Sequence, residues 1–187
     1  SKTLTNIADV VIQSLVPIVT KEFESRFGVI ESSSLAILAY GKLGSGELMP
    51  SSDLDLVIIY DAKADAHAVE TDRSLPASAY FIRLAQRIVS ALTLMTSEGR
   101  LFEVDLRLRP SGAQGPFASN LESFKKYQSS EAWVWEHLAL TKARVVYATD
   151  DIALQIEKTV DGVLCTKREK RDIGKAIAQM RTRIRKE

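Results

Sequence analysis

The chain has 187 residues, 45% of them hydrophobic, so it can bury the core of one domain or of two small ones. Its 25 basic and 24 acidic residues give a formal net charge of +1, too small an excess to favour nucleic-acid binding overall. The single Cys165 cannot form an internal disulfide, and we find no signal peptide and no apolar run near the roughly 20 residues of a membrane span. We therefore expect a cytoplasmic protein that does not enter a membrane. Because the chain begins without Met and stops within a helical pattern, we also expect an excised piece of a longer protein.

The first part of the chain mixes helical and extended patterns. Apolar residues at helical spacing predict a long amphipathic helix over 4–19, with a kink at Pro17. Short apolar runs at 35–40 and 53–60 predict buried strands. A stripe of large apolar side chains then predicts a helix over 79–96.

The segment 101–109 alternates strictly between apolar and charged residues, which predicts a third strand. Its charged face would carry Glu103, Asp105, Arg107 and Arg109. The order helix, strand, strand, helix, strand indicates an α/β (α+β) fold for this part of the chain.

From Asn120 onward the pattern is helical. Polar residues before the apolar repeats, Asn120 or Ser119 and Ser129 or Ser130, are candidate N-caps. The predicted helices cover 121–128, 130–143, 152–165 and 167 to the end.

The helix predicted over 130–143 carries Trp133 and Trp135, which one helical stripe cannot bury together. Trp133, His137 and Leu140 would share one face. We expect the tryptophans to serve core and interdomain packing rather than nucleotide stacking, and His137 to be a hydrogen-bonded structural residue.

Charge is uneven along the chain: from Lys167 onward there are nine basic and three acidic residues. Nucleic-acid binding by this tail is the secondary interpretation. An apolar stripe runs through it, which instead predicts a helix docking on the rest of a longer chain. The stripe consists of Ile173, Ile177, Met180 and Ile184.

The turn 41–46 between the first two strands contains Gly41, Gly44 and Gly46. Glycine permits backbone conformations closed to other residues, so amide groups there and the hydroxyl of Ser45 could approach phosphate oxygens. The turn is therefore a candidate anion site.

Two carboxylates follow this turn. The period of a strand places Asp53 and Asp55 on one face, roughly 7 Å apart along the chain. Such like charges repel unless a cation lies between them, and Mg²⁺ binds carboxylates and phosphates together. If the third strand lies alongside, Asp105 completes a two-metal site, and Arg107 and Arg109 are available for phosphates or as structural partners of carboxylates.

Each of these signals alone has a plainer explanation. Glycine turns followed by an Asp-x-Asp strand occur by chance, and in calcium loops. A calcium loop draws its ligands from alternate positions of one turn, not from two strands. The glycine turn, the acidic pair and the later acidic strand in this order favour a nucleotidyltransferase site.

Four motifs together resemble those of glutamine synthetase adenylyltransferases, and the resemblance covers nearly the whole chain. They are Gly41-Lys-Leu-Gly44, Ser52-Asp-Leu-Asp-Leu56, Glu103 to Gly112 (Glu-Val-Asp-Leu-Arg-Leu-Arg-Pro-Ser-Gly) and Glu131-Ala-Trp-Val-Trp-Glu-His137. That family has two homologous catalytic halves. The last two motifs are similar to its C-terminal half, which attaches AMP to glutamine synthetase; the other half removes AMP by phosphorolysis.

The resemblance implies the nucleotidyltransferase fold of the DNA polymerase β type. We expect a catalytic domain over 1–118, with a small mixed sheet packed by helices, and a C-terminal all-helical region over 119–187, truncated at its end. The implied reaction is transfer of AMP from ATP to a tyrosine of glutamine synthetase with release of pyrophosphate, which regulates nitrogen assimilation. A PII-type nitrogen regulatory protein is an expected partner of the full-length chain.

The resemblance also assigns roles. Asp53, Asp55 and Asp105 would be catalytic and would bind two Mg²⁺ ions, with Asp105 at the ion nearer the acceptor. The β- and γ-phosphates of ATP would contact Gly44 and Ser45. Charge on the leaving group would be stabilised by Lys42, Arg107 or Arg109.

Two alternatives stay open. The same metal site could run backwards and phosphorolyse adenylylated glutamine synthetase. The chain could also be a regulatory or nucleic-acid-binding module in which arginines neutralise the aspartates and no metal binds.

Overall fold

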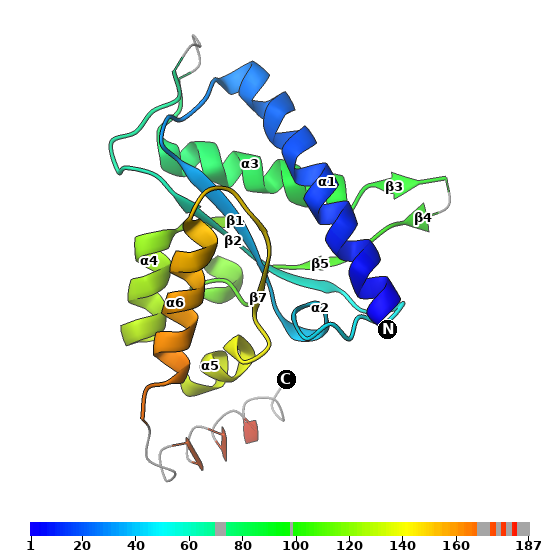
Figure 1. Cartoon of the computed structure of the whole chain (residues 1–187), viewed down its shortest axis with the longest axis vertical. Helices are drawn as coiled ribbons and strands as arrows, with labels where there is room; N and C mark the ends of the chain where they lie inside the picture. Colours follow the sequence, from blue (N-terminus) through cyan, green and yellow to red (C-terminus); the bar gives the residue numbers. More distant parts are fainter. Residues whose placement is uncertain (70–73, 98, 168–172, 175–176, 179–180, 183–187) are drawn as a thin grey trace.

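The computed structural model of the chain describes residues 1–69, 74–97, 99–167, 173–174, 177–178 and 181–182 (Figure 1). Its centre is a mixed sheet with the strand order β5-β2-β1-β7, in which β6 also pairs with β2. Helices cover both faces of this sheet. The expected α+β class, with a small mixed sheet packed by helices, is confirmed.

The two central strands, β1 (Ser34–Ala39) and β2 (Leu54–Asp61), pair antiparallel and lie within one or two residues of the predicted runs. Their apolar composition suits strands that are covered on both faces. β7 (Arg144–Ala148) pairs antiparallel with β1. β5 (Val104–Asp105) and β6 (Ala118–Asn120) both pair parallel with β2.

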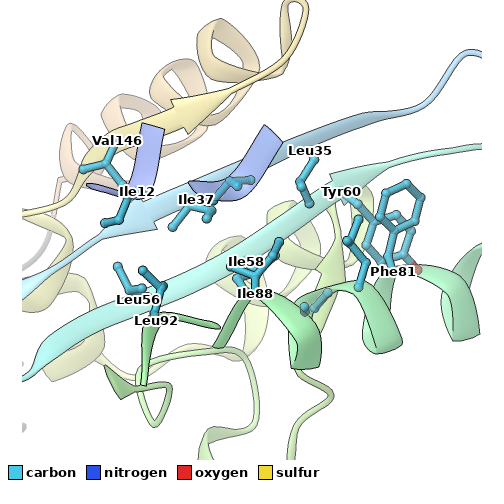
Figure 2. Close-up of a cluster of buried hydrophobic side chains, with 14 of the residues drawn as sticks. Ile12, Leu35, Ile37, Leu56, Ile58, Tyr60, Phe81, Ile88, Leu92 and Val146 are labelled. Carbon is cyan, nitrogen blue, oxygen red and sulfur yellow. The ribbon is translucent and has the colours of Figure 1, made fainter. Parts of the chain in front are cut away.

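Alternate side chains of β2 enter two separate cores. Leu56 and Ile58 belong to the core that α1 and α3 cover, where Figure 2 shows Ile58 beside Ile88 and Leu56 beside Leu92 of α3. Val57 and Ile59 belong to the other core, which α4 and α6 cover. This alternation fixes the side of the sheet on which the aspartates of β2 lie.

Helix α1 (Lys2–Phe27) is longer than predicted and continues through Pro17. Among the described helices it is the one that is long and apolar enough to cross a membrane, judged by length and composition, so the expectation that no such run exists was wrong. One face of α1 packs against the body of the protein, where Phe23 meets the ring of Tyr80 edge-on with centroids 5.0 Å apart.

Helix α3 (Ala77–Leu92) ends four residues before the predicted boundary. Its last turn is closed by Thr93, whose hydroxyl donates to the carbonyl of Val89 at 2.9 Å. The chain then forms a two-stranded ribbon, β3 (Met95–Thr96) with β4 (Gly99–Arg100), which projects from the body (Figure 1).

The strand predicted over 101–109 is wrong for most of its length, because only Val104–Asp105 pairs with the sheet. The chain turns immediately afterwards: the amide of Arg107 donates to Asp105 Oδ1 at 2.7 Å, and the amide of Arg109 donates to the carbonyl of Leu106 at 3.1 Å. Pro110 has no N–H to offer a strand ladder. A short 3₁₀-helix, η1 (Gly112–Gln114), follows.

The region after residue 119 is not all helical, which corrects that expectation. It contains α4 (Leu121–Lys126), the π-helix η2 (Tyr127–Glu131), α5 (Val134–Leu140) and α6 (Ile152–Leu164). Between α5 and α6, however, β7 returns to the central sheet. The predicted domain boundary between residues 118 and 119 stays a prediction, although β7, from the second predicted domain, pairs with β1 in the sheet of the first. Most of the basic tail and part of its apolar stripe lie outside the described residues.

Asn120 is the N-cap of α4, as predicted, because its Oδ1 accepts from the amide of Glu122 at 2.9 Å. Ser129 and Ser130 do not cap a helix but lie in η2. Trp133 is the N-cap of α5 and is half exposed, so it does not share a buried face with His137 and Leu140. His137 is buried with Nε2 at 2.9 Å from the carbonyl of Gln128, which confirms its structural role.

Candidate active site

Asp53 and Asp55 lie at the beginning of β2, Asp53 exposed just before the strand and Asp55 half-buried within it. Alternation along the strand places Asp55 on the side of Val57 and Ile59, the side covered by α4 and α6. That Asp53 shares this face stays a prediction, although its charge acts on Asp55 and raises the pKa of that carboxyl.

Asp105 lies directly beside Asp55. β5 runs parallel to β2 with Leu54 opposite Val104 and Asp55 opposite Asp105. The amide of Leu54 donates to the carbonyl of Glu103 at 2.8 Å, which fixes this register. Neighbouring strands are about 4.8 Å apart, so the two carboxylates branch from adjacent backbones. The predicted position of Asp105 is confirmed, although the strand that carries it is short.

The environment of the two carboxyl groups sets their pKa values apart. Burial raises the pKa of Asp55, and the neighbouring charges of Asp105 and Asp53 raise it further. Hydrogen bonds from the Arg107 side chain lower the pKa of Asp105. The Asp55 carboxylate is therefore crowded by like charge, while the Asp105 carboxylate is neutralised by Arg107.

Gly41 lies against the crowded carboxylate. Its φ is +52°, in the left-handed region, and a Cβ added there would lie 2.2 Å from Asp55 Oδ2. The amide of Tyr40 donates to the carbonyl of Asp55 at 2.9 Å and ties the two segments together. Only glycine lets the chain pass this close to the aspartate.

The turn that was predicted as a phosphate cradle is a short helix, α2 (Gly41–Gly44). The amides of Gly44 and Ser45 donate to the carbonyls of Tyr40 and Gly41 at 2.8 and 3.1 Å, so they are already bonded. The Ser45 hydroxyl is exposed and donates to Glu47 at 3.0 Å. Phosphate contacts of Gly44 and Ser45 thus stay predictions; a phosphate could bond the exposed Ser45 hydroxyl only by replacing Glu47 as its partner.

Gly44 has a structural role that the sequence pattern did not reveal. A Cβ there would lie 1.9 Å from the carbonyl oxygen of Lys142, because the chain entering β7 crosses it closely. Arg144 then donates to the carbonyl of Leu43 at 3.2 Å and to Asp9 at 3.0 Å. Since Arg144 is about a hundred residues from α2 in sequence, no local pattern could link them.

The two arginines of the predicted strand have different surroundings. Arg107 is exposed and contacts Asp105 through Nε and Nη2 at 2.8 and 2.6 Å. Arg109 is buried, and its guanidinium donates to the carbonyls of Leu106, Ala113 and Gly115. Arg109 therefore organises the turn after β5, which favours the structural alternative for this residue; its phosphate role stays an untested prediction.

The carboxylates of Asp53, Asp55 and Asp105 are the candidate ligands of a metal ion. Over the residues that the structure describes, no three His, Cys, Asp or Glu side chains converge as a ready metal-binding group. Asp105 instead points at Arg107. The donor set still fits Mg²⁺, because it consists of carboxylate oxygens, and the like charge that crowds Asp55 is what a divalent cation would relieve. Lys42 is exposed on α2, and its charge also acts on Asp55.

The protein thus has an α+β fold, with a mixed sheet covered by helices on both faces. Its candidate site contains two adjacent aspartates on parallel strands and a glycine turn that contacts one of them. Two exposed cations, Lys42 and Arg107, lie beside this acidic site. The sequence model of the family described as glutamate-ammonia ligase adenylyltransferase matches residues 1–159. The chain belongs to this family.

Curated relatives are similar in sequence to this chain over nearly its whole length. The bifunctional glutamine synthetase adenylyltransferase/adenylyl-removing enzyme of Mesorhizobium japonicum is 42% identical over 186 residues, which cover 100% of this chain and 19% of the relative. The proteins of the same description from Rhodopseudomonas palustris (strain BisB5) and Brucella suis are 44% and 40% identical over 182 residues, or 97% of this chain and 18% of each relative. The chain thus spans about a fifth of the length of these relatives.

Proposed function

We propose that the chain transfers AMP from ATP to a tyrosine hydroxyl of glutamine synthetase and releases pyrophosphate. The observation that carries the proposal is the register of Asp55 beside Asp105, with Asp53 two residues away, next to the exposed cations Lys42 and Arg107. Relatives that share the whole chain are described as acting on glutamine synthetase in both directions. The adenylylating direction rests on the motif around Arg109 and the motif around Trp133.

In this proposal Asp53, Asp55 and Asp105 hold two Mg²⁺ ions. When bound, the ions would screen the negative charge of the triphosphate and of the leaving pyrophosphate. Lys42 and Arg107 would add positive charge on the same side. Gly41 keeps the Asp55 carboxylate accessible, because any side chain at that position would collide with it.

The acceptor hydroxyl must lose its proton, since the pKa of free tyrosine is about 10. As the hydroxyl oxygen bonds to the α-phosphorus, the bond from that phosphorus to the bridging oxygen breaks and pyrophosphate leaves. Asp105 is the candidate acceptor of the proton. While Arg107 holds it, Asp105 is a weak base, because the hydrogen bonds lower its pKa. Movement of Arg107 to the phosphates would make Asp105 more basic when the proton must leave.

A two-way labelling assay tests this function. One arm supplies ATP labelled at the α-phosphate with unmodified glutamine synthetase; the other supplies phosphate with adenylylated glutamine synthetase. The proposal expects label on glutamine synthetase in the first arm and no release of ADP in the second. The reverse pattern would assign the phosphorolytic reaction.

One observation favours a second candidate, a regulatory module without catalysis: Arg107 already neutralises Asp105. Calorimetry separates the two. Magnesium-dependent ATP binding that Asp55→Asn removes supports the enzyme, whereas absence of such binding in the unaltered chain supports the module.

A further inference from the structure

A groove of about 380 Å³ opens beside Asp53. Its walls come from the first turns of α1, the loop between α2 and β2, and the segment that joins β4 to β5. Ile7, Met49 and Leu101 line it and remain about half exposed. Its volume lies in the range of sites that accept side chains or small ligands.

The charge of this groove does not suit a triphosphate. Its one basic side chain, Arg100, is paired with Glu103, and Asp53 adds a second negative charge. The exposed cations that suit phosphates, Lys42 and Arg107, do not line it. Asp53 therefore stands between a groove with apolar walls and a side of the site with basic side chains.

Resting on the proposed function, we propose that this groove binds the acceptor polypeptide, and that Ile7, Met49 and Leu101 contact apolar side chains flanking the hydroxyl that receives AMP. A groove with a net negative charge excludes the phosphates while accepting an uncharged segment. Because Asp53 lines the groove, a segment bound there would reach the edge of the proposed metal site.

The test compares Leu101→Asp with Leu154→Asp. Both leucines are similarly exposed, 54% and 50%, but Leu154 lies on α6 and does not line the groove. The 187-residue chain is immobilised, and its affinity for unmodified glutamine synthetase is measured by surface plasmon resonance. Calorimetry gives its affinity for ATP with magnesium. We expect Leu101→Asp to weaken binding of glutamine synthetase about tenfold or more with ATP affinity unchanged, and Leu154→Asp to change neither.

Met49→Asp provides a second groove variant, so that the test holds if Leu101→Asp lowers the melting temperature. Groove variants that bind glutamine synthetase as the unaltered chain does overturn the proposal, and so do variants that lose ATP affinity instead. Binding that depends on Leu101 in a chain that transfers no AMP would contradict the proposed reaction and leave the groove assignment standing. If both groove variants transfer AMP as fast as the unaltered chain does, the groove assignment is wrong and the proposed reaction stands.

Discussion

Arg107 closes over Asp105 with its own backbone and side chain: the amide donates to Oδ1 at 2.7 Å, and Nε and Nη2 donate to Oδ2 at 2.8 and 2.6 Å. The arginine side chain is 77% exposed, so it can leave the carboxylate without disturbing the core. The pair therefore joins a candidate base to a candidate phosphate ligand in one local turn.

The first prediction concerns this pair. Arg107→Ala should raise the pKa of Asp105, because its main stabilising hydrogen bonds are lost. A carboxyl whose folded pKa is lowered stabilises the fold above its unfolded pKa and loses that contribution as the pH falls through the folded pKa. The variant should thus lose part of this acid-sensitive stability. Titration of the Asp105 carboxyl by NMR measures the effect, and Arg100→Ala, which breaks the ion pair with Glu103, is the control that should leave Asp105 unchanged.

Asp55 should show the opposite dependence on pH. Its pKa is raised above the ordinary 3.8, so the folded state binds more protons than the unfolded chain between pH 3.8 and the folded pKa. The free energy of unfolding therefore falls as the pH rises through that window. Asp55→Asn should abolish this fall and stabilise the metal-free protein at pH 7 by about 0.5 kcal/mol.

Urea unfolding at a series of pH values checks this prediction. Asp61→Asn, at the other end of β2, is the matched control and should keep the fall. A variant at position 55 that is less stable than the unaltered chain at pH 7 would mean that the aspartate is not crowded by like charge.

Much of the fold followed from local sequence. The apolar runs of β1 and β2 and the stripe of α3 predicted their elements because burial on one or both faces dictates such patterns. β7 was missed because its role as a sheet neighbour of β1 depends on a pairing more than a hundred residues apart. The strict alternation at 101–109 misled, since Arg107 and Arg109 use their backbone and side chains to close a turn instead.

The sequence predicted the positions of the acidic residues of the site better than it predicted their contacts, because contacts depend on segments far apart in the chain. Residue type and period predicted the acidic residue Asp55 at the start of β2, and the charged segment supplied Asp105 at the strand position beside it. Which donors are already bonded is a property of three-dimensional contacts. The amides of Gly44 and Ser45, the carbonyl partners of Arg109 and the contact of Gly41 with Asp55 could therefore not be predicted from the sequence.

Gly44 and Gly162 provide a matched pair of substitutions. Gly44→Ala should destabilise the fold by about 1–3 kcal/mol, because the added Cβ meets the backbone carbonyl of Lys142 and neither can give way. Gly162→Ala, within α6 and with open space around its Cβ position, should stabilise it by about 0.5–1 kcal/mol. Thermal unfolding of the two variants decides the matter, and equal melting temperatures would show that β7 does not pack on α2 as described.

Arg109→Lys should act on stability rather than on nucleotide binding. A lysine ammonium cannot reproduce the planar fork that donates to three carbonyls, so the loss should be about 2 kcal/mol. ATP affinity, measured by calorimetry below the unfolding temperature, should stay within twofold. Weakened ATP binding in a fully stable variant would instead restore the phosphate role.

The measurement that tests the central claim most directly is single-turnover transfer of labelled AMP from ATP to glutamine synthetase by Asp105→Asn and Glu103→Gln. Both carboxylates lie on the same short segment, but Asp105 is paired in register with Asp55, whereas Glu103 is exposed and bound to Arg100. The account predicts that Asp105→Asn slows transfer by about 10²–10⁴-fold with ATP binding largely kept, and that Glu103→Gln slows it only mildly. Rapid transfer by Asp105→Asn together with inactive Glu103→Gln would contradict it.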